Sequence, residues 1–178
     1  MSCQIVLIGY MGCGKTTVAK HLAKKMSIEH IDLDTEIEKS EKLSIPRLFK
    51  KYNEIIFRKI EKKKLLDILD CKTNCVISVG GGTPCYFDNM KRICSTTKNV
   101  FYLKTSNEIL ANRLFLSRNN RPLISKIRTI EKMKEFIAKH IFERSSFYQL
   151  SHHTIVTNDK AFDQISKEII LIVNQKQH

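Results

Sequence analysis

The chain has 178 residues, 42% of them hydrophobic, and a formal net charge of +13. This length suits one α/β domain, residues 1–178, with a substantial core, and it is too short for two comfortable domains. No apolar run approaches the roughly 18–20 residues that span a bilayer, and the first residues lack the features of a secretory leader, so we expect a cytoplasmic protein with no membrane partner.

The charge and the cysteines carry no motif of their own. Lysines are spread over nearly every predicted helix and form no basic tail, which favours a solvated basic surface over a nucleic-acid partner. The six cysteines show no CxxC pair and no zinc-like spacing with histidines. We therefore expect reduced thiols rather than a structural metal site or disulfides.

Strand-like apolar runs alternate with helical patterns along the chain. The runs lie at residues 4–8, 28–31, 75–79, 99–103 and 154–157, and a last helical pattern covers residues 161–174. This alternation predicts an α/β fold with a five-stranded, mainly parallel sheet that helices cover on both faces.

The first run leads directly into "GYMGCGKT" and then into a predicted helix. Gly9, Gly14, Lys15 and Thr16 fit the phosphate-binding pattern G-x-x-x-x-G-K-[ST]. The glycines let backbone N–H groups face phosphate oxygens, Lys15 reaches the β- and γ-phosphates, and the Thr16 hydroxyl can ligate Mg²⁺. We expect a nucleoside triphosphate to contact Gly12, Cys13, Gly14, Lys15, Thr16 and Thr17.

The second run ends in "HIDLDTE". In an extended chain Asp32 and Asp34 would point to one side, roughly 6–7 Å apart, at the edge of the sheet where ligands of open α/β folds bind. One carboxylate could then support the metal while the other accepts a hydrogen bond or proton from a hydroxyl group. The alternative is that Asp34 is simply a helix N-cap.

Two segments interrupt the alternation of strands and helices. Residues 34–69 are helical in pattern, and residues 113–126 contain the polar string "LSRNNRPLISK". We expect both to form small mobile parts of the domain. In a helix over residues 55–69, Glu61 would lie beside Arg58 and orient it; the alternative is an exposed arginine in a basic helix.

A phosphate-binding loop leaves open whether the γ-phosphate is hydrolysed or transferred. The NKxD motif of GTPases is absent, and no apolar strand ends in Asp-Glu as in motor ATPases. The third run ends instead in "VISVGGGTP". Phosphoryl transfer to an acceptor is therefore the favoured reaction.

The ordered set of motifs resembles the shikimate kinase family. The phosphate-binding loop is followed at suitable separations by "DLD", "FRKIE", "GGG", "RPL" and "ERSSFY", which cover essentially the whole chain. The resemblance implies a three-layer P-loop fold with a five-stranded parallel sheet, a helical substrate-binding insert and a mobile lid. It also implies transfer of a phosphoryl group from ATP, with Mg²⁺, to the 3-hydroxyl of shikimate.

The resemblance also implies a role for each motif. Asp32 supports Mg²⁺ together with Thr16, and Asp34 binds the shikimate hydroxyls next to the attacking oxygen. Arg58 and Arg144 clamp the substrate carboxylate, a task that suits planar bidentate donors. The backbone of Gly80, Gly81 and Gly82 approaches the substrate, and Phe49 and Phe57 form apolar walls.

In the lid, Arg121 matches the residue that reaches the transferring phosphates, so the implied catalytic residues are Lys15, Asp34 and Arg121. Arg113 is the expected neighbour of adenine, with Arg118 as the alternative.

We expect a monomer with shikimate and ATP as its partners. Two other classes stay open: a different small-molecule P-loop kinase, such as a gluconate or nucleoside monophosphate kinase, and a nucleotide-dependent nucleic-acid-binding or switch protein supported only by charge.

Overall fold

The computed structural model describes residues 3–118 and 123–175, and its centre is one five-stranded sheet. The strand order is β2-β3-β1-β4-β5, and every neighbouring pair is parallel. The strands are β1 (Gln4–Ile8), β2 (Glu29–Asp32), β3 (Cys75–Ser78), β4 (Val100–Lys104) and β5 (His153–Val156). The predicted α/β fold is confirmed, and each strand begins and ends within one residue of its predicted run.

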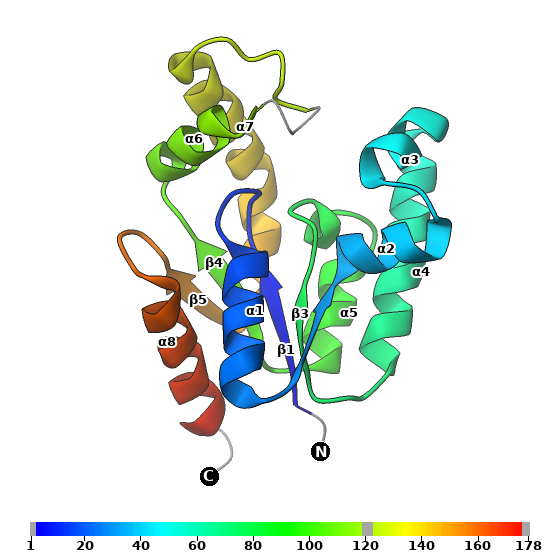
Figure 1. Cartoon of the computed structure of the whole chain (residues 1–178), viewed down its shortest axis with the longest axis vertical. Coiled ribbons are helices and arrows are strands. Elements are labelled where there is room, and N and C mark those ends of the chain that lie inside the picture. Colours follow the sequence, from blue (N-terminus) through cyan, green and yellow to red (C-terminus); the bar gives the residue numbers. More distant parts are fainter. Residues whose placement is uncertain (1–2, 119–122, 176–178) are drawn as a thin grey trace.

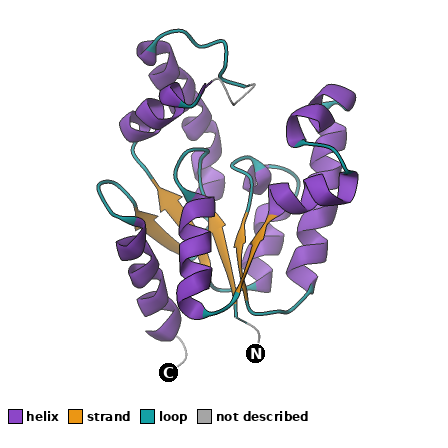
Figure 2. Ribbon diagram, viewed as in Figure 1, coloured by secondary structure: helices purple, strands orange, loops and turns teal. Residues whose placement is uncertain are grey.

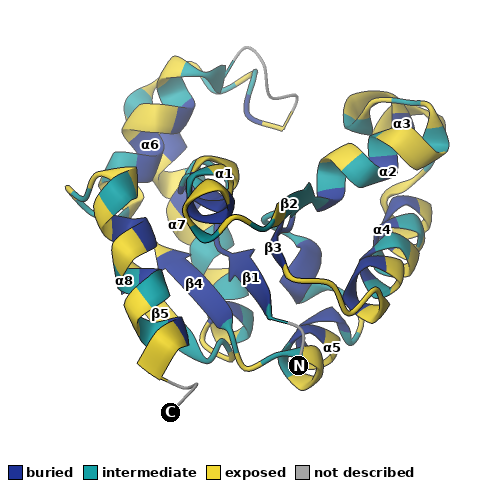
Figure 3. Cartoon of the chain, turned by 60° about the horizontal axis from the view of Figure 1, so that its bottom comes forward, coloured by how far each residue is buried: buried dark blue, intermediate teal, exposed yellow. Residues whose placement is uncertain are grey.

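Burial follows position in the sheet. All five residues of the central strand β1 are buried, whereas the edge strands β2 and β5 are partly exposed. Figure 3 shows β1 and β4 in the colour of buried residues between helices. A continuous apolar run such as that of β1 suits a parallel sheet because helices cover both of its faces.

Helices form the outer layers. α1 (Lys15–Met26) packs beside α8 (Phe162–Gln175) in front of the sheet in Figure 1, and α5 (Asn89–Thr96) lies behind it. The buried residues of α1 recur at helical spacing, so one stripe of the helix faces the sheet. They are Lys15, Val18, Ala19, Leu22 and Ala23. Figure 2 shows the resulting layers, with the sheet between helices.

Two helical projections rise above the carboxyl ends of the strands (Figure 1). The first contains α2 (Leu33–Glu41), α3 (Ile45–Lys51) and α4 (Glu54–Asp70), which match the predicted insert. The second contains α6 (Asn107–Leu116) and α7 (Ile130–Tyr148), on either side of the predicted lid. In the described part of the chain, no helix combines the length and the apolar character that a membrane span requires.

The end of β2 differs from the sequence prediction. An extended chain through Asp34 is wrong, because β2 ends at Asp32 and α2 begins at Leu33. An N-cap at Asp34 is wrong as well: Asp32 is the N-cap, and its Oδ1 accepts a hydrogen bond from the Thr35 backbone N–H at 3.2 Å. Asp34 therefore lies in the first turn of α2.

Candidate active site

The phosphate-binding loop is built by glycines in backbone conformations that other residues avoid. Gly9, Gly12 and Gly14 have φ values of 144°, 82° and 98°. A Cβ on Gly9 would lie 2.8 Å from the Leu103 carbonyl oxygen. The loop can therefore curl tightly between β1 and α1, which points the N-terminal end of α1 at the cavity and makes that end suited to an anion.

Lys15 is buried inside this loop. Its Nζ donates hydrogen bonds to the carbonyl oxygens of Gly9 at 2.9 Å and Tyr10 at 3.1 Å. The loop therefore holds the ammonium group next to a cavity of about 470 Å³. The cavity is lined by Met11, Gly12, Gly14, Lys15, Thr16, Thr17, Asp32, Asp34, Val79, Gly80, Gly81, Arg113, Leu114, Ser117 and Phe162.

Asp32 is the centre of a hydroxyl cluster on one side of the cavity. Its Oδ2 accepts hydrogen bonds from Thr16 Oγ1 at 3.1 Å and Ser78 Oγ at 2.7 Å. Burial raises the pKa of Asp32, but the hydrogen bonds from Ser78, the Thr35 N–H and Thr16 outweigh it and hold the pKa below the ordinary value. The group is therefore an anion at neutral pH, and hydroxyl and carboxylate oxygens are the ligands that Mg²⁺ prefers.

Asp34 has the opposite electrostatic character. Burial raises its pKa to about 6, and the negative charges of Asp32 and Glu61 add to the effect while Lys15 opposes it. A carboxyl group with this pKa is mostly ionised at pH 7 and is still basic enough to take a proton from a hydroxyl group. It lines the same cavity as Asp32 and Lys15.

The three glycines after β3 lie where side chains would collide with the site. A Cβ on Gly80 would lie 3.2 Å from Asp34 Oδ1, and one on Gly82 would lie 2.9 Å from Arg58 Nη2. A Cβ on Gly81 would lie 3.0 Å from the backbone nitrogen of Met11. Their bare backbone therefore lets the two sides of the site approach each other.

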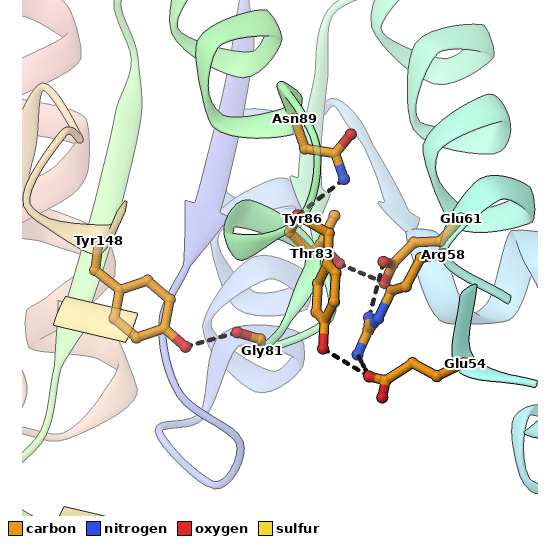
Figure 4. Close-up of polar contacts among 8 residues, drawn as sticks. All are labelled: Glu54, Arg58, Glu61, Gly81, Thr83, Tyr86, Asn89 and Tyr148. Carbon is orange, nitrogen blue, oxygen red and sulfur yellow. Dashed lines mark hydrogen bonds and ion pairs between the residues drawn. The ribbon is translucent and has the colours of Figure 1, made fainter. Parts of the chain in front are cut away.

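Arg58 is buried, so the alternative of an exposed arginine is wrong. The guanidinium Nη1 donates to Glu61 Oε2 at 2.8 Å, and Glu61 Oε1 accepts from Thr83 Oγ1 at 2.7 Å (Figure 4). The predicted pairing of Arg58 and Glu61 on α4 is confirmed by this contact. The guanidinium carbon also lies 4.0 Å from the centre of the Tyr86 ring, which fixes the plane of the group.

Arg144 of α7 approaches the same region from the other projection. Its guanidinium carbon lies 5.6 Å from the centre of the Tyr10 ring. Burial raises the pKa of the Cys85 thiol to about 11, and the positive charges of Arg144 and Arg58 both oppose this rise. Both guanidinium groups are therefore within electrostatic range of Cys85, in the turn after β3, although they are 86 positions apart in the sequence. Two guanidinium groups placed in this way suit a carboxylate ligand.

The remaining predicted arginines have different positions. Arg113 lines the cavity, and its Nη1 donates to the Gly12 carbonyl at 3.3 Å. Arg118 instead folds back onto α6, where it stacks on the Phe115 ring at 4.1 Å. Arg121 lies outside the described residues. The structure thus brings Arg113, rather than Arg118, to the phosphate-binding loop.

Comparison with known proteins decides which class of P-loop protein this is. The family model of shikimate kinase matches residues 11–174. The chain belongs to the shikimate kinase family. Among curated relatives, the shikimate kinase of Flavobacterium johnsoniae is 42% identical over 170 residues, 96% of this chain and 98% of the relative. That of Geobacillus kaustophilus is 36% identical over 167 residues, 93% of this chain and 86% of the relative.

Solved shikimate kinases share the fold. That of Bacteroides thetaiotaomicron has a TM-score of 0.89 at 29% identity, covering 97% of this chain and 98% of that one. A shikimate kinase of Acinetobacter baumannii in complex with shikimate has a TM-score of 0.84 at 30% identity, and the match covers 99% of this chain and 95% of that one. The family prediction is confirmed, and the reaction of the family is phosphorylation of shikimate in aromatic biosynthesis. This family match rejects the two alternatives, another small-molecule kinase and a nucleotide-dependent nucleic-acid-binding or switch protein.

Several residues of this shikimate kinase fold escaped the sequence prediction. Ser78 hydrogen-bonds Asp32, Tyr86 covers Arg58, and Tyr148 donates from α7 to the Gly81 carbonyl at 2.6 Å (Figure 4). Phe162 begins α8 and lines the cavity. Two of these residues had a local signal: Ser78 lies two residues before the glycines at the carboxyl end of a predicted strand, and Tyr148 is the last residue of the motif "ERSSFY".

Proposed function

We propose that the chain phosphorylates the 3-hydroxyl of shikimate with ATP and Mg²⁺ at the site described above. The observation that carries the proposal is the arrangement around the glycine turn: Asp34 lies on its Gly80 side, and Arg58 on its Gly82 side. A ligand that spans this turn would place a carboxylate near the arginines and a hydroxyl group near Asp34. Shikimate carries both groups.

ATP occupies the cavity beside the phosphate-binding loop in this proposal. The triphosphate contacts Gly12, Cys13, Gly14, Lys15, Thr16 and Thr17. Lys15 neutralises charge on the β- and γ-phosphates, and Arg121 of the lid adds to this when residues 113–126 close over the site. Arg113 takes the position next to adenine, since it is the lid-side arginine that lines the cavity.

The residues present fit a magnesium ion. Thr16 Oγ1 and Asp32 Oδ2 lie 3.1 Å apart, and the lowered pKa keeps Asp32 ionised. We propose that Thr16 and Asp32 hold the ion, with Ser78 orienting the carboxylate. When bound there, Mg²⁺ supplies positive charge to the phosphate oxygens.

The acceptor side uses the protein's own groups. Arg58 and Arg144 bind the carboxylate of shikimate, and the backbone of Gly80, Gly81 and Gly82 packs against its ring. Asp34 orients the hydroxyl group and accepts its proton late in the transfer, which its pKa of about 6 allows. Water exclusion by the lid then directs the phosphoryl group to this hydroxyl.

The remaining proposals concern the whole chain. We propose a monomeric single domain in which residues 34–69 are the substrate-binding insert and residues 113–126 are the lid. Because the reaction consumes ATP, we place it in the cytoplasm. We propose no nucleic-acid partner; binding of DNA or RNA that falls steeply with salt near physiological ionic strength would contradict this.

The function is tested by ADP release with ATP, Mg²⁺ and shikimate, and by the same assay without shikimate. We expect release that depends on shikimate and produces its 3-phosphate in equal amount. Release at the same rate without shikimate would contradict the proposal.

The metal assignment is tested by kcat across a Mg²⁺ titration: high Mg²⁺ should partly rescue Asp32→Asn and should not rescue Asp34→Asn. Rescue of Asp34→Asn alone would reverse the two roles.

A further inference from the structure

Arg58 contacts two glutamates that differ in how firmly they are held. Glu61 has only 1% of its side chain exposed and contacts Nη1 at 2.8 Å. Glu54 has 55% of its side chain exposed and contacts Nη2 at 3.4 Å. Glu61 is therefore the fixed partner, while Glu54 lies at a longer and solvent-open contact that another anion can replace.

Glu54 is nevertheless anchored at this place. The Tyr86 hydroxyl donates a hydrogen bond of 2.6 Å to Glu54 Oε1, the same oxygen that contacts Arg58 Nη2 (Figure 4). The Tyr86 ring also stacks on the guanidinium at 4.0 Å. One tyrosine thus fixes both the arginine and the carboxylate beside it, from the turn after β3 that also contains Gly82.

The remaining donors of Arg58 show where a ligand carboxylate can bind. Nη1 is held by Glu61, and Nε is buried with no hydrogen-bond partner among the described residues. Nη2 is therefore the donor whose partner can be exchanged, and its present partner is Glu54. Hydrogen bonding from Tyr86 lowers the pKa of Glu54, burial opposes this, and the charges of Arg58 and Arg144 lower it further. Glu54 is thus an anion in the field of both arginines.

We propose that Glu54 is an internal competitor for the carboxylate clamp: its carboxylate takes the place on Arg58 Nη2 that the carboxylate of the acceptor must occupy. This inference rests on the proposed assignment of Arg58 and Arg144 to the shikimate carboxylate. Glu54 then sets the affinity for the acceptor and penalises weakly bound carboxylates, because every carboxylate ligand of Arg58 Nη2 must displace it. A ligand without a carboxylate gains nothing from its removal.

The test measures shikimate affinity in Glu54→Gln. Removal of the competing charge should lower KM and the dissociation constant for shikimate about twofold to fivefold, the range expected for a half-exposed ion pair, and leave the KM for ATP unchanged. Glu131→Gln is the matched control, an exposed glutamate in the first turn of α7, and it should match the wild type. The neutral methyl ester of shikimate should bind both variants equally.

Two further measurements keep the outcomes separate. Tyr86→Phe keeps the ring but loses the hydroxyl that anchors Glu54, so its KM for shikimate should also fall. An unchanged or raised KM for shikimate in Glu54→Gln, with normal thermal unfolding, overturns the competitor role and indicates that Glu54 positions Arg58. If instead Arg58→Lys leaves the KM unchanged, or shikimate is no substrate, the proposed function fails and the competitor role fails with it.

Discussion

Asp32 and Asp34 are two residues apart, yet their carboxyl groups depart from the ordinary pKa in opposite directions. Hydrogen bonds from Ser78, Thr35 and Thr16 stabilise the charge of Asp32 against burial. Among the causes of the shift at Asp34 within the described part of the chain no hydrogen-bond donor stands out, and burial together with neighbouring negative charge raises its pKa to about 6. At the residue scale, hydrogen-bond donors decide which carboxylate is a stable anion and which is a base.

Asp34→Asn should stabilise the protein near neutral pH in buffer with a metal chelator and no nucleotide. The pKa rises from 3.8 to about 6 on folding, so between these values the folded state binds a proton that the unfolded state lacks. Stability therefore falls as pH rises through this range, and the full cost is present above pH 6. Asparagine avoids this cost, a gain on the order of 3 kcal/mol at pH 7.5 that falls to well under 1 kcal/mol at pH 4. Urea unfolding at both pH values measures the difference, and an equal gain at both would contradict the shift.

Lys15→Met should lower the catalytic rate without lowering the stability of the fold. The variant keeps much of the buried aliphatic chain but loses the cation that the Gly9 and Tyr10 carbonyls hold beside the cavity. We expect kcat to fall about 10²–10³-fold, as for other lost charge-stabilising groups. Thermal unfolding without nucleotide should change little. Wild-type turnover in the folded variant would show that the loop does not bind the transferring phosphates.

At the scale of elements, the turn after β3 decides how closely the parts of the site approach. Its three glycines face Asp34 and Glu61, the phosphate-binding loop, and the guanidinium of Arg58 in turn. Such contacts need backbone without side chains. The short helix η1 (Thr83–Cys85) then returns the chain, and its Thr83 hydroxyl binds Glu61. One turn thus sets the distance between α4 and the phosphate-binding loop.

Gly82→Ala tests this role. The backbone of Gly82 has φ −89°, which alanine adopts freely, so any effect comes from the added methyl group. Its Cβ would lie 2.9 Å from Arg58 Nη2 and 3.2 Å from Nη1. Displacement of the guanidinium should raise the KM for shikimate about tenfold, which corresponds to about 1.4 kcal/mol, with the KM for ATP nearly unchanged. Normal shikimate kinetics would show that Arg58 does not depend on this turn.

At the scale of the molecule, α7 connects the lid side to the substrate side. The Tyr148 hydroxyl near its end donates to the Gly81 carbonyl, and His140 Nδ1 lies 3.1 Å from the Tyr10 hydroxyl. Both contacts join α7 to loops at the carboxyl edge of the sheet. Arg144 lies between them on the helix, so its position depends on both.

Tyr148→Phe should therefore lower stability and affect shikimate binding together. The side chain is fully buried, and loss of its hydroxyl leaves the Gly81 carbonyl without this donor. We expect a loss of about 1–2 kcal/mol in the free energy of unfolding by urea. The KM for shikimate should rise severalfold because Gly81 and Arg144 are held less firmly. Tyr102→Phe is the matched control. Tyr102 lies on β4 and its ring stacks on that of Tyr148, so loss of its hydroxyl should leave shikimate binding unchanged.

The sequence by itself determined the elements whose signals are local. Apolar runs predicted all strands to within one residue, and "GYMGCGKT" predicted the phosphate-binding loop, because strand, glycine turn and helix are adjacent in the chain. The pairing of Arg58 with Glu61 was also predictable, since the spacing of three residues places both on one face of a helix.

Only the tertiary structure decided how these elements meet. The burial of Arg58 depends on Tyr86 from the turn after β3, and the proximity of Arg144 depends on α7 packing against that turn. The backbone conformation at Asp34 was mispredicted, although Asp34 does line the cavity with Asp32. The choice between extending β2 and starting α2 depends on the capping hydrogen bond that Asp32 accepts, which alternation does not reveal. Contacts between segments far apart in the chain carry no periodic signal, so the pKa of Asp34 and the partners of Arg58 follow only once the sheet and its helices are packed.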